Sequence, residues 1–115
     1  MEANISCCLM CKSTDDEMDL QQELNLTLNY DLKNKEYEIF KVELKSWELE
    51  DVLSELFNKI APLIPKLKLL VLRDNIKLYI DICIVHYDKY PALIIEGNNM
   101  DIIRELKADI AIDIY

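Results

Sequence analysis

Hydrophobic and polar residues alternate without a break over the last eight residues of the chain, 108–115. The hydrophobic positions are Ile110, Ile112 and Ile114, and the positions that alternate with them include Asp109, Asp113 and Tyr115. A period of two is typical of a strand with one face in the core and one in solvent. We therefore expect a strand here with buried isoleucines, and a complete small domain that ends on this strand.

The same alternation predicts further strands along the chain. They are expected around residues 5–11, 24–30, 37–45, 76–85 and, more briefly, 91–96. The runs at 24–30 and 37–45 flank a short polar connection, which is typical of a β-hairpin. About six strands in all are predicted.

Helical spacing is strongest directly after the predicted hairpin. Apolar residues recur there every three or four positions: Leu49, Val52, Leu53, Leu56, Phe57 and Ile60. Ser46 is the expected N-cap of this helix. Pro62 and Pro65 interrupt the pattern, so a second helical piece at an angle to the first is expected over 64–73.

Two shorter helices complete the predicted elements. One is expected near 15–22, opened by a capping box of Thr14 and Glu17, and the other around 102–106. The whole chain, 1–115, is expected to form a single α+β domain, a two-layer sheet-and-helix sandwich with a mostly antiparallel sheet. The β-α-β-β-α-β order of the first elements favours a ferredoxin-like variant.

The charge of the chain restricts its partners. It has 22 acidic and 13 basic residues, for a net charge of −9. Such a protein repels phosphate backbones and anionic membranes, so neither nucleic acid nor membrane is an expected partner, whereas a basic protein is attracted. No apolar run approaches the ~18 residues of a membrane span, and no signal peptide opens the chain, which predicts a cytoplasmic location.

The cysteines near the N-terminus form the sharpest chemical motif, a C-C-x-x-C run of Cys7, Cys8 and Cys11. The spacing of Cys8 and Cys11 suits zinc, and His86 is the one histidine that could join them. The strand pattern, however, places Cys8 on the opposite face from Cys7 and Cys11. We therefore expect buried structural thiols with no metal and no cofactor, and keep a metal or thiol site on these four residues as the weaker alternative.

Enzymatic motifs are missing from the chain, so an enzyme is the less favoured class. Gly97 is the only glycine, which excludes a P-loop and a dinucleotide-binding fingerprint. There is no metalloprotease motif and no nucleophile elbow.

Acidic and aromatic residues occupy the polar faces of two predicted strands: Tyr79, Asp81, Asp109, Asp113 and Tyr115. If these strands are neighbours, the residues form one patch that suits a basic protein partner. We predict a small non-catalytic binding module, and most concretely an immunity or inhibitor protein for a basic toxin or nuclease. The alternative is a self-associating structural module that pairs its hairpin or terminal strands as a homodimer.

The second half of the chain, 46–115, resembles a bacterial family known as domain of unknown function 4279. The resemblance rests on Ser46-Trp47 before the long helix, the strand of 78–85, the run Pro91-Ala92-Leu93-Ile94-Ile95 and the Asp-Ile-Tyr ending. The glycine that the family usually has between the last helix and strand is Lys107 here. The resemblance implies an α+β sheet-and-helix fold and a bacterial source, and it implies no activity.

Overall fold

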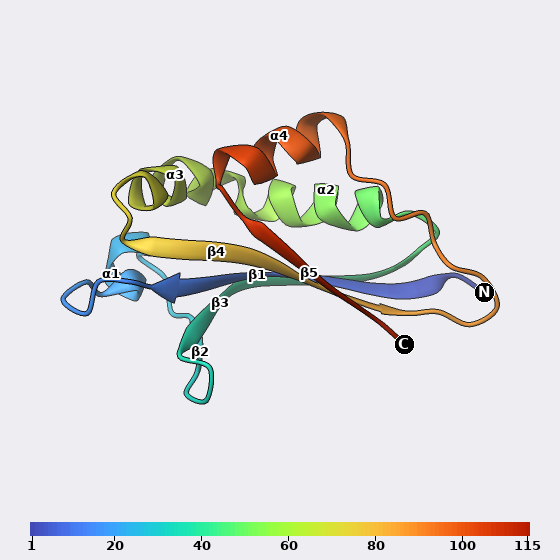
Figure 1. The fold of residues 1–115 in the computed structure, drawn as a ribbon, viewed down its shortest axis with the longest axis horizontal. Helices are drawn as coiled ribbons and strands as arrows, with labels where there is room; N and C mark the ends of the chain where they lie inside the picture. The colour runs from blue at the N-terminus through green and yellow to red at the C-terminus, as the bar shows by residue number, and fades with distance from the viewer.

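The computed structural model describes all residues from 1 to 115 and shows a five-stranded sheet with helices on one of its two faces (Figure 1). The strands are β1 (Ala3–Ser13), β2 (Asn29–Asp31), β3 (Glu36–Ser46), β4 (Ile76–Val85) and β5 (Asp109–Ile114). The helices are α1 (Leu20–Leu24), α2 (Leu49–Ile60), the short 3-10 helix η1 (Ala61–Leu63), α3 (Ile64–Leu72) and α4 (Gly97–Glu105). None of them is long and apolar enough to cross a membrane.

The strand order across the sheet is β2-β3-β1-β4-β5. β1 lies antiparallel between β3 and β4, β2 forms an antiparallel hairpin with β3, and β5 runs parallel to β4. β1 and β2 therefore run parallel to each other with the antiparallel strand β3 between them. β3 and β4 likewise run parallel, with β1 between them. Interleaved β-α-β units of this kind are the arrangement of ferredoxin-like folds, to which β5 is added beside β4. The predicted α+β class with a mostly antiparallel sheet is confirmed.

The hydrophobic core lies between the sheet and the helical layer. Alternate residues of β1 and β4, among them Ile5, Leu9 and Ile82, face the helices with no exposed surface. The apolar stripe predicted for the long helix is buried along its whole length on α2: Leu49, Val52, Leu53, Leu56, Phe57 and Ile60. A helix with one apolar stripe and a sheet with one apolar face bury each other in two layers. The predictions of β1, β3, β4, α2, α3 and the hairpin are confirmed at nearly the expected positions.

The first helix begins later than the capping box of Thr14 and Glu17 predicts. The side chain of Asp19 caps α1 and accepts hydrogen bonds from two backbone N–H groups of its first turn. The Thr14 hydroxyl instead donates to the carbonyl of Asp74, which ties this loop to the turn before β4. The prediction of a helix near 15–22 is therefore wrong in its boundaries, because a different side chain supplies the N-cap.

The strand predicted over 24–30 is reduced to the three residues of β2. Leu24 belongs to α1, which ends at Asn25 in the left-handed conformation with a φ of 54°. The N–H of Leu28 donates to the side chain of Gln21 at 2.8 Å rather than to a neighbouring strand. Leu24 and Leu28 reach the core without sheet pairing, and their burial accounts for the alternation that suggested a longer strand.

No sixth strand forms over 91–96, contrary to the prediction. Ala92 makes a single bridge to the connection between β3 and α2. Its N–H donates to the carbonyl of Trp47 at 2.7 Å, and its carbonyl accepts from the N–H of Leu49 at 2.9 Å. Pro91 has no N–H to donate, and the segment links β4 to α4 at one end of the sandwich (Figure 1).

Two helix starts also differ from the prediction. Ser46 ends β3 and is not the N-cap of α2; its hydroxyl accepts from the N–H of Glu48 at 3.0 Å, and Glu48 takes the N-cap position. α4 begins at Gly97, which has a φ of +57°, so this glycine opens the helix instead of breaking the chain before it.

β5 is a strand as predicted, but its isoleucines are not buried. Ile110, Ile112 and Ile114 keep 38%, 43% and 43% of their surface exposed. The strand is the edge of the sheet beside β4, and the helical layer covers this edge incompletely. Alternation in the sequence therefore predicts the strand but not its burial.

Candidate functional site

The face of the sheet opposite the helices, which we call the open face, is covered by no helix (Figure 1). It carries the residues of each strand that alternate with the core residues. On β4 these are the odd-numbered positions from Lys77 to Val85, and on β1 the even-numbered positions from Asn4 to Lys12. An uncovered sheet face is expected to be polar, because every second residue of its strands meets solvent.

β4 and β5 are direct neighbours, as the predicted patch requires. Their parallel register places Tyr79 beside Asp109, and Asp81 beside Ala111. Asp113 lies beside Cys83 on the same face. Tyr115 follows Asp113 in the alternation, and its N–H donates to the carbonyl of Ile84 at 2.8 Å. The structure thus brings the five predicted residues to one half of the open face.

Glu36 and Glu38 join this group from β3, and the sequence analysis missed them. A bulge shifts the pairing of β1 and β3 between Leu9 and Met10, so that Glu38 pairs with Met10 although Phe40 pairs with Leu9. Ile39 is the extra residue of the bulge. Without the bulge, both glutamates would lie on the same face as Phe40. The two adjacent apolar residues at 39 and 40 are the sequence signal that could have revealed it.

We call the assembled group the acidic patch. It consists of Glu36, Glu38, Tyr79, Asp81, Asp109, Asp113 and Tyr115. None of its five carboxylates makes an ion pair, since the four salt bridges of the protein all lie elsewhere. The two glutamates accept hydrogen bonds from neutral donors only: the Tyr79 hydroxyl on Glu36, and the Cys8 thiol and the Asn29 amide on Glu38. The negative charge of the patch is therefore uncompensated by ion pairing.

The titration of two patch residues reflects this crowding. Burial raises the pKa of Asp81, and the nearby carboxylates of Asp113 and Glu36 raise it further, while Lys41 acts in the opposite direction. Burial also raises the pKa of Tyr79, with the hydrogen bond to Glu36 and the negative charge around it adding to the effect. Like charges in a half-buried site disfavour ionisation, so a cation brought to this surface would relieve the repulsion.

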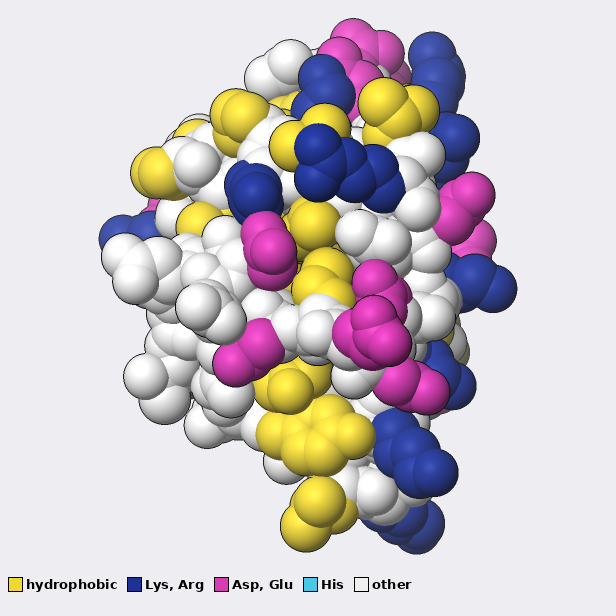
Figure 2. All heavy atoms as spheres, turned by 90° about the vertical axis from the view of Figure 1, so that its left-hand side faces the viewer, with side chains coloured by type: hydrophobic (Ala, Val, Ile, Leu, Met, Phe, Trp, Pro, Cys, Tyr) yellow, Lys and Arg dark blue, Asp and Glu magenta, His cyan; other side chains and the backbone are white.

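Lysines on the open face border the patch, and Lys41 lowers the pKa of Asp81. Lys41 lies opposite Cys8 on β3, and Lys12 and Lys77 face each other across β1 and β4 at the end of the strands. The end of the molecule that carries α1 and the hairpin is more mixed, with Lys and Arg side chains beside Asp and Glu side chains and apolar side chains between them (Figure 2). The acidic patch is thus distinguished by the gathering of its five carboxylates on one uncovered face of the sheet.

The structure divides the N-terminal cysteines between the two faces of the sheet. Cys7 and Cys11 face the core with no exposed surface, and burial raises the pKa of each thiol to about 12. Cys8 lies on the open face, where its thiol donates to the Glu38 carboxylate at 3.3 Å and lies 3.3 Å from the Met10 sulfur. Burial, together with that hydrogen bond, raises the pKa of Cys8 as well. Protonated thiols are poor nucleophiles and poor metal ligands.

His86, the fourth residue of the alternative metal site, is also separated from the three cysteines. The His86 ring packs against the Tyr90 ring, tilted by 37° with ring centroids 4.1 Å apart, and the backbone N–H of His86 donates to the carbonyl of Tyr115. Its buried Nδ1 atom has no hydrogen-bond partner. No three His, Cys, Asp or Glu side chains of the protein form a group that could hold a metal ion.

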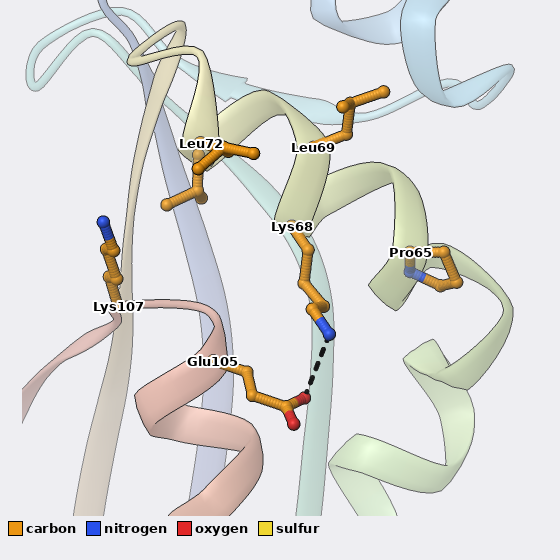
Figure 3. Close-up of a pocket in the computed structure, with 7 residues that line it drawn as sticks. Pro65, Lys68, Leu69, Leu72, Glu105 and Lys107 are labelled. Carbon is orange, nitrogen blue, oxygen red and sulfur yellow. Dashed lines mark hydrogen bonds and ion pairs between the residues drawn. The ribbon is translucent and has the colours of Figure 1, made fainter.

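A hollow lies between α3 and the end of α4 (Figure 3). It has a volume of about 310 Å³, and Pro65, Leu69, Leu72 and Lys107 are among its lining residues. Lys68 reaches across it to Glu105, with an Nζ to Oε2 distance of 3.4 Å. This exposed ion pair joins two helices, and no histidine, cysteine or serine lines the hollow.

Comparisons of the chain with protein-family models, with curated proteins and with solved structures find no match. The resemblance to the domain of unknown function 4279 family stays a prediction. The function of the protein has to be inferred from the geometry of the open face.

Proposed function

We propose that this protein is a non-catalytic binding module that holds a basic protein partner against its acidic patch. The observation that supports the proposal is the gathering of five carboxylates, none of them in an ion pair, on a sheet face that no helix covers. Unpaired carboxylates on an open surface are complementary to lysine and arginine side chains.

The shape of the patch favours a protein over a small ligand. Small molecules bind in concave sites that enclose most of their surface, whereas the patch spreads over neighbouring strands of an uncovered sheet. Tyr79 and Tyr115 lie among the carboxylates, and tyrosine is enriched at protein interfaces because it combines a large apolar ring with a polar tip.

The electrostatics favour a basic partner. The raised pKa of Asp81 arises from its burial and from two neighbouring carboxylates. An arginine or lysine side chain of a partner that binds at this position would form an ion pair with these carboxylates. The net charge of −9 would steer such a partner toward the molecule from a distance. Within this class, an immunity or inhibitor protein for a basic toxin or nuclease fits the small size and the missing catalytic residues, and a bacterial, cytoplasmic setting goes with that version of the proposal.

The test is affinity capture from host lysate at low and high salt, read by mass spectrometry, with three baits. The first is the unaltered protein, and the second carries Asp81→Asn, Asp109→Asn and Asp113→Asn. The third is a control that removes the same number of charges from exposed positions outside the sheet strands: Asp16→Asn, Asp88→Asn and Asp101→Asn.

A basic partner that the unaltered and control baits retain, that the patch variant loses and that elutes as salt rises would support the proposal. Equal retention by the patch variant would contradict it. Equal loss from both variants would show that net charge, and not the patch, attracts the protein.

A further inference from the structure

β5 is an exposed edge of the sheet, and the charges of Asp109 and Asp113 are its only protection against pairing with another strand. All six of its residues are exposed, and it contains no proline, glycine or lysine. Proteins usually blunt an edge with such residues or with a very short strand, because an open edge is a template for another strand. At the opposite edge β2 has only three residues, and the part of β3 that β2 leaves uncovered contains Lys41 and Lys45.

The unpaired backbone groups of β5 belong to the same residues as its exposed apolar side chains. Tyr115 donates its N–H to the carbonyl of Ile84 at 2.8 Å, and its own carbonyl accepts from the N–H of His86 at 3.3 Å. The backbone of Tyr115 therefore points toward β4. Because successive residues of a strand point their N–H and C=O groups to opposite sides, those of Ile110, Ile112 and Ile114 point away, to the free edge.

We propose that β5 pairs antiparallel with β5 of a second copy of this chain, about a two-fold axis at Ile112. Ile112 then lies opposite Ile112 of the second copy, and Ile110 lies opposite Ile114. The outward N–H and C=O groups of all three isoleucines gain partners, and the two five-stranded sheets become continuous. The isoleucines of both copies form one apolar row on the helix side of the joined sheet.

The aspartates of β5 select this register. A two-fold axis at Ala111 would pair the two strands over a similar length. It would, however, place Asp109 directly opposite Asp113 of the second copy, at two symmetry-related positions. Like charges directly opposite each other are destabilising. An axis at Ile112 places Asp109 opposite Tyr115 and Asp113 opposite Ala111, so that no two carboxylates face each other directly.

A second copy fits this edge. The edge is apolar on the helix side and polar on the open side, and β5 of a second copy has the same alternation. The contact is short compared with the roughly 800 Å² that each partner buries in a standard stable interface. The dimer therefore depends on concentration. Two molecules with a net charge of −9 repel each other, so added salt should strengthen the pairing by screening.

The salt response separates this inference from the proposed function. Binding of a basic partner weakens as salt rises, whereas the β5 pairing strengthens. The pairing uses the backbone edge and the helix-side isoleucines, and the acidic patch uses side chains of the open face, so either can fail while the other holds.

The first test is the mass of the purified protein by sedimentation equilibrium, from micromolar to near-millimolar concentration, at low and high salt. The I112K variant places two ammonium groups at the two-fold axis, and L72K is the control, since Leu72 is 73% exposed on α3. We expect dimers of the unaltered protein and of L72K that increase with concentration and salt, and a monomer for I112K with an unchanged circular dichroism spectrum. A monomer of the unaltered protein throughout, or a dimer that weakens with salt, would overturn the proposal.

The second test concerns the register and uses cysteines in a C83S background, which removes the partly exposed native thiol. I112C lies opposite itself across the axis, at a Cα separation of about 5.5 Å for a hydrogen-bonded pair, which a disulfide can span. We expect mild oxidation to convert I112C to a covalent dimer and to leave I110C largely monomeric. Cross-linking of I110C as fast as I112C would overturn the register.

Discussion

The hydroxyl of Tyr79 donates a 2.7 Å hydrogen bond to the carboxylate of Glu36, and this bond passes over β1, the strand that separates the two residues. Tyr79 belongs to β4 and Glu36 to β3. The bond exists only because the bulge at Ile39 turns Glu36 to the open face. One irregularity in β3 therefore both supplies carboxylates to the acidic patch and holds one of them in place.

Replacing Tyr79 by phenylalanine should destabilise the protein modestly. The substitution removes one hydrogen bond at a half-buried position, and such a bond contributes about 1 kcal/mol to the free energy of unfolding. Urea unfolding followed by circular dichroism measures the change. Y87F is the matched control, because Tyr87 is exposed and makes no side-chain hydrogen bond. Equal midpoints for Y79F and the unaltered protein would show that the Tyr79–Glu36 bond contributes nothing in solution.

Asp81 should make the stability of the protein depend on pH. Its pKa is raised in the folded state above the ordinary value of 3.8, so the folded protein holds this proton more tightly than the unfolded chain does. The group therefore favours folding at low pH, and this contribution is lost as the pH rises from about 3.8 through the folded pKa.

The D81N variant, which cannot ionise, should accordingly be more stable than the unaltered protein at pH 7, and the gain should vanish below the ordinary carboxyl pKa. Thermal unfolding of both proteins across the acidic range measures the difference, with D16N as an exposed control. A gain for D81N that persists unchanged in acid would rule out ionisation as its cause. Stabilisation by D81N together with weaker partner binding would fit a surface kept acidic for recognition at some cost in stability.

The elements that could be predicted from the sequence are those constrained by burial along their whole length. On β1 and β4 every second residue faces the helices, and on α2 the apolar stripe has six buried members. Each of these patterns extends along its whole element, and its single physical cause is burial between the sheet and the helices. The place of Asp81 and Asp109 on the open face also follows from the alternation of their strands. That β4 and β5 are neighbours, which brings the two residues into one patch, could be known only from the strand order.

The remaining features depend on contacts that a local pattern does not contain. Leu24 and Leu28 alternate because both are buried in the core, not because they pair in a sheet. Ile112 alternates like a buried residue, yet the edge position of β5 leaves it exposed. Glu38 changes face because one bulge inverts the parity of β3. Strand order, edge position and bulges are tertiary properties, and they determine both the composition of the patch and the free edge.

The four thiols should differ sharply in reactivity. Cys7 and Cys11 are fully buried and have pKa values near 12, and Cys8 is nearly buried with a raised pKa, so all three should resist alkylation of the native protein. Cys83 is the partly exposed one. We expect a thiol reagent to modify one cysteine rapidly, located at Cys83 by peptide mapping, and all four only in denaturant. Rapid native modification of Cys7 or Cys11 would contradict the burial of the β1 core face.

Asn99 should control how firmly α4, and β5 after it, are held to the rest of the fold. It is a buried polar residue of α4, and its side-chain amide donates to the Ser54 hydroxyl at 2.9 Å and to the carboxylate of Glu50, both on α2. Its replacement by alanine leaves these acceptors without their donor, which typically costs about 1–3 kcal/mol for buried groups.

For N99A we expect a lower urea midpoint and faster amide hydrogen exchange, concentrated in α4 and β5, with the exchange of β1 changed least. N98A, at an exposed position of the same helix turn, is the matched control and should leave both readouts unchanged. Faster exchange spread evenly over the sheet would mean that α4 and β5 do not open as a unit. A local effect would show that the free edge proposed to pair with a second copy is positioned by the α2–α4 contact, because only residues 106–108 separate α4 from β5.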